Sequence, residues 1–236
     1  MKWTYQRDGG ENYPVKFGDV WTVGNSAVLI CGDIEQGHGD MLPDYLVWGP
    51  VSLLYCDPPW GAALARGFRT KSGVDGDSGK IVDFDIFLRR FALIAKLYYE
   101  VPTLVEMGLS WEDDMDAAFI HADAQVVSKR WRTTYYGSRP SSLHLYQWAG
   151  APLLSDVPNF EGMDDGKTPA LAVSSLCREG SMVVDLFTGR GLTAKEALGI
   201  GRGFGGLELS PYRASAALTT MAGITGATPK KIDEVT

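Results

Sequence analysis

The chain has 236 residues, of which 45% are hydrophobic and 22% charged, and its formal net charge is −7. This size fits one domain with a full buried core, so we predict a single domain over residues 1–236. No apolar run approaches the roughly 18 residues of a membrane span, and the first residues lack the apolar core of a signal peptide. Three widely spaced cysteines favour neither a disulfide framework nor a zinc site. We therefore expect a cytoplasmic protein without a membrane or metal partner.

Strands and helices are predicted to alternate along the chain. In order, we expect strands over 26–33 and 51–57, a mobile loop over 66–80, a helix over 83–100, a strand over 103–107, a short helix from 110, a hairpin turning at 138–140, a helix over 168–180, a strand over 181–187, a helix over 192–201, a strand over 203–209 and a helix over 211–223. The tail 226–236 is expected to fray. This alternation predicts an α/β fold with a mostly parallel sheet, an antiparallel hairpin and helices on both faces.

The stretch LLYCDPPWG at 53–61 places an acid, two prolines and a tryptophan directly after an apolar strand. Proline cannot donate to a sheet ladder, so the strand must end there. Asp57 and Trp60 are then left at the carboxyl end of the strand, where open α/β sheets bind ligands. The pattern indicates a site in which polar groups bind a flat ligand. Trp60 by itself would be better interpreted as a core or lid aromatic.

A second informative stretch, VVDLFTGRGLTA, joins a buried strand through a glycine turn to a helix. Gly189 and Gly191 let the backbone turn sharply and approach a ligand. The next strand ends in Glu208, an acid placed to take two ribose hydroxyls as in nucleotide-binding units. The turn lacks the third glycine of the dinucleotide pattern, so a smaller adenosine-bearing ligand fits better. The alternative is a unit whose glycines only make turns.

Basic side chains gather in SKRWRTTYYGSRP at 128–140, which contains no acid. The overall negative charge is unlike that of a dedicated nucleic-acid binder. Contact with a polyanion is therefore expected at this segment, through Lys129, Arg130, Arg132 and Arg139. A solvated strand face explains the segment equally well.

Together, these stretches resemble the S-adenosylmethionine-dependent DNA amino-methyltransferases. DPPW at 57–60 is similar to the catalytic tetrapeptide of that family, DLFTGRG at 185–191 to its cofactor loop, and GKTPALAVSSL at 166–176 to the helix before that loop. The catalytic motif comes first and the cofactor motif last, which is the order of the β class. The resemblance covers residues from about 18 to 220 and implies a Rossmann-like methyltransferase fold.

The resemblance implies a role for each residue of the tetrapeptide. The Asp57 side chain and the Pro58 carbonyl would accept the two N–H bonds of an exocyclic amino group, and the fixed φ angles of Pro58 and Pro59 would hold that carbonyl in place. Trp60 would stack on a base that has left the helix. The loop at 66–80 would close over the extruded nucleotide.

For the cofactor S-adenosylmethionine, the resemblance implies a further set of contacts. Phe187, Gly189 and Gly191 would surround the methionine end, with Asp185 at the sulfonium or the amino group. Glu208 would hold the ribose. The remaining contacts would be Lys167 and Thr168 at the carboxylate and Asp33 at the adenine.

The implied reaction is methylation of adenine N6 in DNA, because the tetrapeptide begins with Asp rather than the serine typical of cytosine N4 enzymes. Cytosine N4, an RNA or small-molecule substrate, and a non-catalytic cofactor-binding subunit remain alternatives. Only the short acidic segment 150–165 occupies the place of a target-recognition region. Sequence specificity would then be low, or supplied by a homodimer or a separate specificity subunit. Restriction-modification, a phage and a regulatory programme are all compatible settings.

Overall fold

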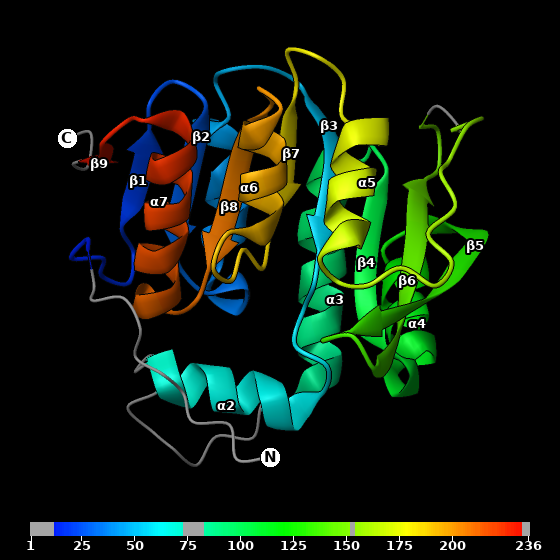
Figure 1. Ribbon diagram of the computed structural model, residues 1–236. Helices are drawn as coiled ribbons and strands as arrows, with labels where there is room; N and C mark the ends of the chain where they lie inside the picture. The colour runs from blue at the N-terminus through cyan, green and yellow to red at the C-terminus, as the bar shows by residue number, and fades with distance from the viewer. Residues whose placement is uncertain (1–11, 73–82, 152–153, 233–236) are drawn as a thin grey trace.

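The computed structural model describes residues 12–72, 83–151 and 154–232, which form one three-layer α/β arrangement around a central sheet (Figure 1). The described residues contribute nine strands in the order β5-β6-β4-β3-β7-β8-β2-β1-β9. No helix among these residues combines the length and apolar character needed to cross a bilayer.

Five parallel strands make the middle of the sheet, and antiparallel strands flank them on both sides. The parallel strands are β2 (Ala27–Cys31), β3 (Val51–Cys56), β4 (Thr103–Gly108), β7 (Met182–Asp185) and β8 (Gly203–Glu208). The antiparallel strands are β1 (Val20–Val23) and β9 (Pro229–Ile232) at one side, and the hairpin β5 (Ala124–Tyr135) and β6 (Arg139–Trp148) at the other. The parallel strands are buried on both faces, which explains their continuous apolar runs.

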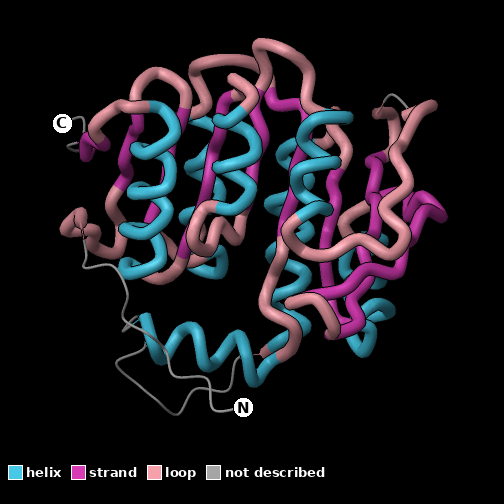
Figure 2. Tube along the Cα trace, in the orientation of Figure 1, coloured by secondary structure: helices cyan, strands magenta, loops and turns pink. Residues whose placement is uncertain are grey.

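Helices cover both faces of the sheet. In Figure 1, α5 (Lys167–Leu176), α6 (Leu192–Gly199) and α7 (Pro211–Thr225) lie in front, whereas α3 (Phe84–Ala95) and α4 (Glu112–His121) lie behind. Asp83 caps α3, because its side chain accepts from two backbone N–H groups of the first turn. The short helix α1 (His38–Met41) precedes β3. Figure 2 shows α2 (Ala62–Ser72) lying apart from these layers, across the lower edge of the sheet.

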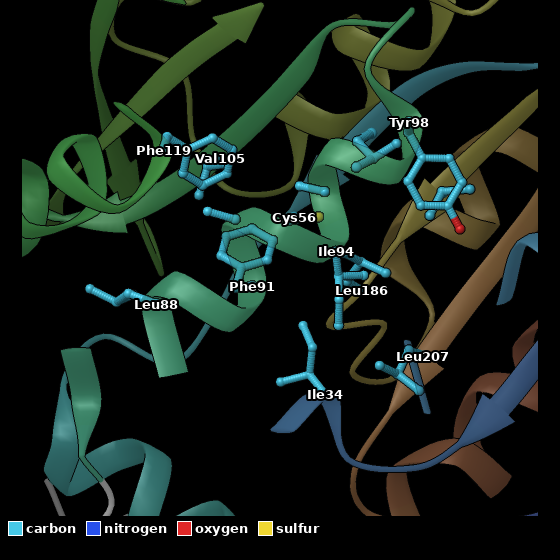
Figure 3. Packing of buried hydrophobic residues seen from close by; sticks show 14 of the residues in the cluster. Ile34, Cys56, Leu88, Phe91, Ile94, Tyr98, Val105, Phe119, Leu186 and Leu207 are labelled. Atoms are coloured by element: carbon cyan, nitrogen blue, oxygen red, sulfur yellow. The ribbon is translucent and has the colours of Figure 1, made fainter. Parts of the chain in front are cut away.

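Two apolar clusters hold the layers together, one on each face. The cluster behind the sheet centres on Phe91 of α3, which packs edge-on against Phe119 of α4 and Phe187 of the glycine turn. Figure 3 shows the Phe91 ring beside the side chains of Val105 and Phe119. The cluster in front contains small residues of α6 and α7 such as Ala194 and Ala217, which let these helices approach the sheet closely.

Two connections leave the neighbouring strands β3 and β7 and run in opposite directions along the sheet. From β3 the chain continues through α3 to β4 on one side, and from β7 it continues through α6 to β8 on the other. Because α3 and α6 cover opposite faces, β3 and β7 flank the topological switch point of the sheet. Ligands of open α/β sheets bind in the crevice at the carboxyl ends of such strands. The tetrapeptide 57–60 and the glycine turn 186–191 follow these two strands directly.

Three sequence-based expectations need correction. The loop expected over 66–80 is wrong for residues 66–72, which belong to α2, and residues 73–80 lie outside the described residues. The tail expected to fray from 226 is wrong for Pro229–Ile232, because β9 pairs antiparallel with β1 along its whole length. The hairpin turns at 136–138, whereas Arg139 and Pro140 already pair with β5.

Candidate active site

Asp57 leaves the end of β3 with both carboxylate oxygens engaged. Oδ1 accepts a hydrogen bond from the Trp60 indole N–H at 2.9 Å, and Oδ2 accepts one from the Tyr135 hydroxyl at 3.0 Å. Tyr135 is the last residue of β5 and lies 78 residues further along the chain. One donor to Asp57 therefore comes from within the tetrapeptide, and the other comes from the hairpin.

Burial raises the pKa of Asp57 to about 6, although the hydrogen bonds from Tyr135 and Trp60 act in the opposite direction. A second carboxyl, that of Glu106 on the neighbouring strand β4, is only 2% exposed and accepts from the hydroxyls of Tyr55 and Ser141. Burial, and next the charge of Asp57, raise the pKa of Glu106 to about 8. Two coupled acids therefore lie at the carboxyl ends of adjacent strands.

The two prolines shape the turn that presents Trp60. The Pro59 carbonyl accepts from the Gly61 backbone N–H at 3.1 Å, while the carbonyl of Pro58 accepts no hydrogen bond from the described part of the chain. The Trp60 ring lies against Tyr135, with ring centroids 4.7 Å apart, and the Arg139 guanidinium carbon stands 5.1 Å from its centroid. An unused carbonyl and a partly exposed indole thus flank the Asp57 carboxylate.

Asp185, the last residue of β7, stabilises the glycine turn that follows it. Asp185 accepts from the Phe187 backbone N–H at 2.9 Å, and Phe187 packs into the cluster behind the sheet. Gly189 and Gly191 have φ angles of 57° and 88°, a region that L side chains rarely adopt. Burial, with added repulsion from Asp57 and Glu208, raises the pKa of Asp185 to about 7. The turn and the tetrapeptide are thus electrostatically coupled across the switch point.

Glu208, at the end of β8, binds the glycine turn directly. Its two oxygens accept from the backbone N–H groups of Gly189 and Ser210, each at 2.8 Å. Asp33 follows the adjacent strand β2, caps the helical turn Ile34–Gln36 and forms a 2.7 Å ion pair with Arg69 of α2. Burial raises the pKa of Glu208 above its usual value. Acids from four neighbouring strands (Asp57, Asp185, Glu208 and Asp33) therefore line one edge of the sheet.

The start of α5 lies near this edge, but its two predicted cofactor residues differ in accessibility. The Lys167 side chain is 73% exposed and pairs with Asp164 at 3.0 Å. The Thr168 side chain is buried, and its hydroxyl donates to the Asp164 carbonyl at 2.8 Å. Thr168 thus stabilises the first turn of its own helix, whereas the Lys167 side chain is exposed and paired with Asp164. Their contact with a cofactor stays a prediction.

The basic residues expected to contact a polyanion fall into separate groups. Arg130 pairs with Asp116, and Arg132 pairs with Glu112, both acids of α4. Lys129 is exposed on β5. Arg139 alone of the four stacks on Trp60 beside Asp57. The structure therefore brings one of the four predicted cations to the tetrapeptide and binds two others to carboxylates within the chain.

Several side chains of the site were not identified from the sequence. Tyr135 and Glu106 reach the tetrapeptide from β5 and β4, and Arg69 and Arg213 reach the acids from α2 and α7. Arg213 also stands 4.4 Å from the centroid of the Phe68 ring. Tyr135 lies in the basic segment 128–140, but only its cations were singled out there. Only the strand order could have indicated that Tyr135 and Glu106 meet the tetrapeptide. Among the described residues, no group of three or more histidines, cysteines, aspartates and glutamates is arranged to hold a metal ion.

Comparison with known proteins adds a fold-level assignment. No family model matches the sequence, and no curated protein is detectably similar to it. The chain shares its fold with several solved DNA methyltransferase structures. The cytosine-N4-specific PvuII DNA methyltransferase superposes with a TM-score of 0.61 at 12% identity, over 85% of this chain and 90% of that one. The M1.HpyAVI–SAM complex gives a TM-score of 0.61 at 11% identity, over 83% of this chain and 98% of that one.

A third similar structure is that of TTHA0409 from Thermus thermophilus, a candidate DNA modification methylase, with a TM-score of 0.59 at 16% identity over 83% of this chain and 94% of that one. It has also been solved with S-adenosyl-L-methionine. These matches confirm the predicted Rossmann-like methyltransferase fold. They span nearly the full length of each similar chain, so the described residues include the common core of these proteins.

Proposed function

We propose that this chain is a DNA amino-methyltransferase that transfers a methyl group from S-adenosylmethionine to adenine N6. The observation that carries the proposal is the meeting of DPPW and the glycine turn at the switch point between β3 and β7. Either motif alone has a purely structural explanation. Their convergence on one crevice supplies a polar acceptor and a nucleotide-type turn where a base and a cofactor must meet.

The residues at this edge fit the cofactor on two counts. S-adenosylmethionine carries a sulfonium and an ammonium, and Asp57 and Asp185 lie at this edge with pKa values raised by burial, so a bound cation would favour their charged forms. Each Glu208 oxygen accepts one backbone N–H and retains capacity for a ribose hydroxyl. Similar structures contain this cofactor. Asp185, Phe187, Gly189, Gly191 and Glu208 would hold it, with Asp33 at the adenine.

The chain's own groups would prepare the amino nitrogen for reaction. An exocyclic amino group is a weak nucleophile, since its lone pair is delocalised into the ring. The Asp57 carboxylate and the Pro58 carbonyl would accept its two N–H bonds, and this draws the nitrogen toward a tetrahedral shape. The bound cofactor would supply an electrophilic methyl carbon. As the nitrogen gains the methyl group it must lose one proton, and the Asp57 carboxylate is placed to take it.

Adenine is preferred over cytosine because the acceptor is a carboxylate, as the tetrapeptide motif implies for adenine N6 enzymes. Cytosine N4 is the second candidate, favoured by the likeness to the PvuII enzyme. Nucleoside mass spectrometry distinguishes the two. After incubation with S-adenosylmethionine and unmethylated DNA, we expect N6-methyladenine in the digest, whereas N4-methylcytosine would keep the mechanism and change the base.

Asp57→Ala tests the assigned mechanism. We expect methyl transfer to fall by at least about 100-fold, which is the typical contribution of a positioned proton acceptor, while calorimetry shows cofactor binding retained. Asp44→Ala, in the exposed segment before β3, is the matched control and should keep full activity. Undiminished transfer by the Asp57 variant would refute the role of this carboxylate. Loss of cofactor binding as well would assign Asp57 to the cofactor site instead.

A further inference from the structure

A hollow of about 240 Å³ opens beside the catalytic tetrapeptide, at the carboxyl ends of β3 and β4. Trp60 forms one wall, and Trp111, which ends the helical turn after β4, forms another. Gly108 and Ser110 lie between them, and Arg139 enters from β6. Neither Asp57 nor Pro58 is among the described residues that line it. The hollow is therefore a neighbour of the proposed reaction centre and not the centre itself.

Trp111 is a fixed platform within this hollow. Its ring packs over Gly61, where an added Cβ would lie only 2.6 Å from the ring carbon Cζ2. The ring of Phe84 meets it edge-on, with centroids 4.7 Å apart. Gly61 also has a φ angle of 106°, which only glycine adopts readily. The indole is thus positioned before any ligand arrives, and little side-chain freedom is lost when a ring stacks on it.

The chemistry of the lining selects a flat, anionic ligand. Two indoles offer stacking surfaces, and the Arg139 guanidinium stands beside one of them at 5.1 Å from the Trp60 centroid. Among the described residues that line the hollow, none is acidic, although acids are abundant elsewhere at this edge. Aromatic rings combined with a cation are the recurring elements of single-stranded nucleic-acid binding.

Charge pairing within the hairpin strengthens this interpretation. Arg130 and Arg132 are bound to carboxylates of α4, so their charge is balanced within the fold. Arg139 instead stacks on an aromatic ring next to Asp57. A phosphate that approaches the tetrapeptide therefore meets Arg139, at the rim of the hollow.

We propose that this hollow binds the nucleotide adjacent to the target base, with the neighbouring base stacked on Trp111 and the phosphate held by Arg139. The proposal rests on the proposed function, since it takes the target base to lie at Asp57. A base on Trp111 has left its own duplex stack, so two successive nucleotides must be unpaired. The chain is then expected to prefer single-stranded or melted DNA over intact duplex.

The test compares two labelled single strands by fluorescence anisotropy in the presence of S-adenosylmethionine. One is oligodeoxyadenylate, and the other replaces every second nucleotide by an abasic unit, so a target base has no neighbour on either side. We expect the wild-type protein to bind the alternating strand about tenfold more weakly, the order expected for one base stacked on an aromatic ring. Intact duplex should bind more weakly than the full single strand.

Variants separate the subsite from general damage to the fold. Trp111→Ala should bind both single strands equally weakly, and Trp111→Phe should restore most of the preference. Arg139→Gln should weaken both strands and lower the salt slope of binding by about 0.7, the value for one phosphate contact on a single strand. Trp48→Ala, a partly buried tryptophan before β3, is the matched control and should keep the wild-type preference.

The outcomes distinguish this proposal from the proposed function. If the wild-type protein binds both single strands equally, or Trp111→Ala keeps the preference, the subsite is wrong even where methyl transfer occurs. A further outcome is that the preference for the full single strand depends on Trp111 while mass spectrometry finds no methylated base. In that case the nucleotide subsite is supported and the proposed reaction is wrong. Tighter binding of duplex than of the full single strand would overturn the requirement for two unpaired nucleotides.

Discussion

At the scale of single residues, the environment of Asp57 is set by three competing effects. Burial disfavours its charged form, whereas hydrogen bonds from Tyr135 and Trp60 favour it. The outcome is a pKa of about 6, so the carboxylate is largely ionised at neutral pH. Each oxygen has one donor and retains a second lone pair, so an amino group can bind beside Tyr135 and Trp60. The Trp60 N–H bond lies in the plane of its ring, so it leaves the ring face available for stacking on a base.

The hydroxyl of Tyr135 is expected to set the acidic limb of the pH–rate profile. In Tyr135→Phe the charged form of Asp57 loses a hydrogen bond worth roughly 1.5–3 kcal/mol. The pKa of Asp57 should therefore rise further above about 6, and the acidic limb should move to higher pH by about one unit or more. Single-turnover rates measured across pH test this shift, and the rate well above the limb should be kept.

Tyr99→Phe provides the matched control. Tyr99 is exposed near the end of α3 and donates to Glu100, so its loss should leave the profile unchanged. An unshifted limb in Tyr135→Phe would mean that this hydroxyl does not stabilise the carboxylate during the reaction.

At the scale of elements, the turn between β7 and α6 depends on backbone that only glycine supplies easily. Gly191 caps α6 with a φ angle of 88°, and a Cβ at this position would lie 3.3 Å from the Cα of Ala217 in α7. The turn is therefore pressed between its helix and α7. Glu208 fixes its other side through the Gly189 N–H. A change at Gly191 should accordingly be transmitted to the proposed cofactor contacts.

Gly191→Ala is expected to weaken S-adenosylmethionine binding by about tenfold, which corresponds to roughly 1.4 kcal/mol, because the turn must shift to relieve the contact with α7. Gly201→Ala is the matched control. Gly201 has a φ angle of 71° but an open surrounding, and it follows α6 at the opposite edge of the sheet. Both variants should lose about 1–2 kcal/mol of stability from the left-handed backbone. Calorimetric titration should show a loss of affinity in Gly191→Ala alone, and equal affinities would contradict the assignment of the turn.

At the scale of the whole molecule, stability should depend on pH through the acids gathered at one edge of the sheet. Burial raises the pKa of Asp57 to about 6, of Asp185 to about 7 and of Glu106 to about 8. A carboxyl with a raised folded-state pKa binds more protons in the native than in the unfolded state. Its contribution to stability is complete below the unfolded pKa and is lost as pH rises through the folded one. The melting temperature should therefore fall between about pH 5 and pH 8.

Glu106→Gln tests this dependence, since glutamine cannot ionise. At pH 5 the variant should be close to wild type, whereas at pH 8 it should melt higher by at least about 2–4 °C, the shift that 1 kcal/mol produces in a domain of this size. Thermal unfolding followed by circular dichroism measures both. Glu196→Gln, at a surface position of α6, serves as the control and should show no such pH-dependent gain. An equal change at both pH values would mean that the ionisation of Glu106 does not change between them and would contradict the prediction.

The sequence by itself determined most of the element order, the mostly parallel sheet and the two motifs, because each depends on residues that are neighbours in the chain. It missed α2 and β9. An apolar run followed by Asp57 and two prolines must end as a strand, and glycines between an acid and a helix must turn sharply. Such local rules apply wherever the segment lies in the molecule. They also explain why a helix that starts at residue 83 was predictable.

Only the tertiary structure decided which side chains meet. Tyr135 reaches Asp57 from 78 residues away because the hairpin joins β4 as the outer part of the sheet. Residues 66–72 form a helix although their pattern is weak, since Phe68 and Arg69 find partners in Arg213 and Asp33. These contacts depend on strand order and helix packing, in which burial, charge pairing and close packing act between distant segments. No single stretch of sequence contains that information.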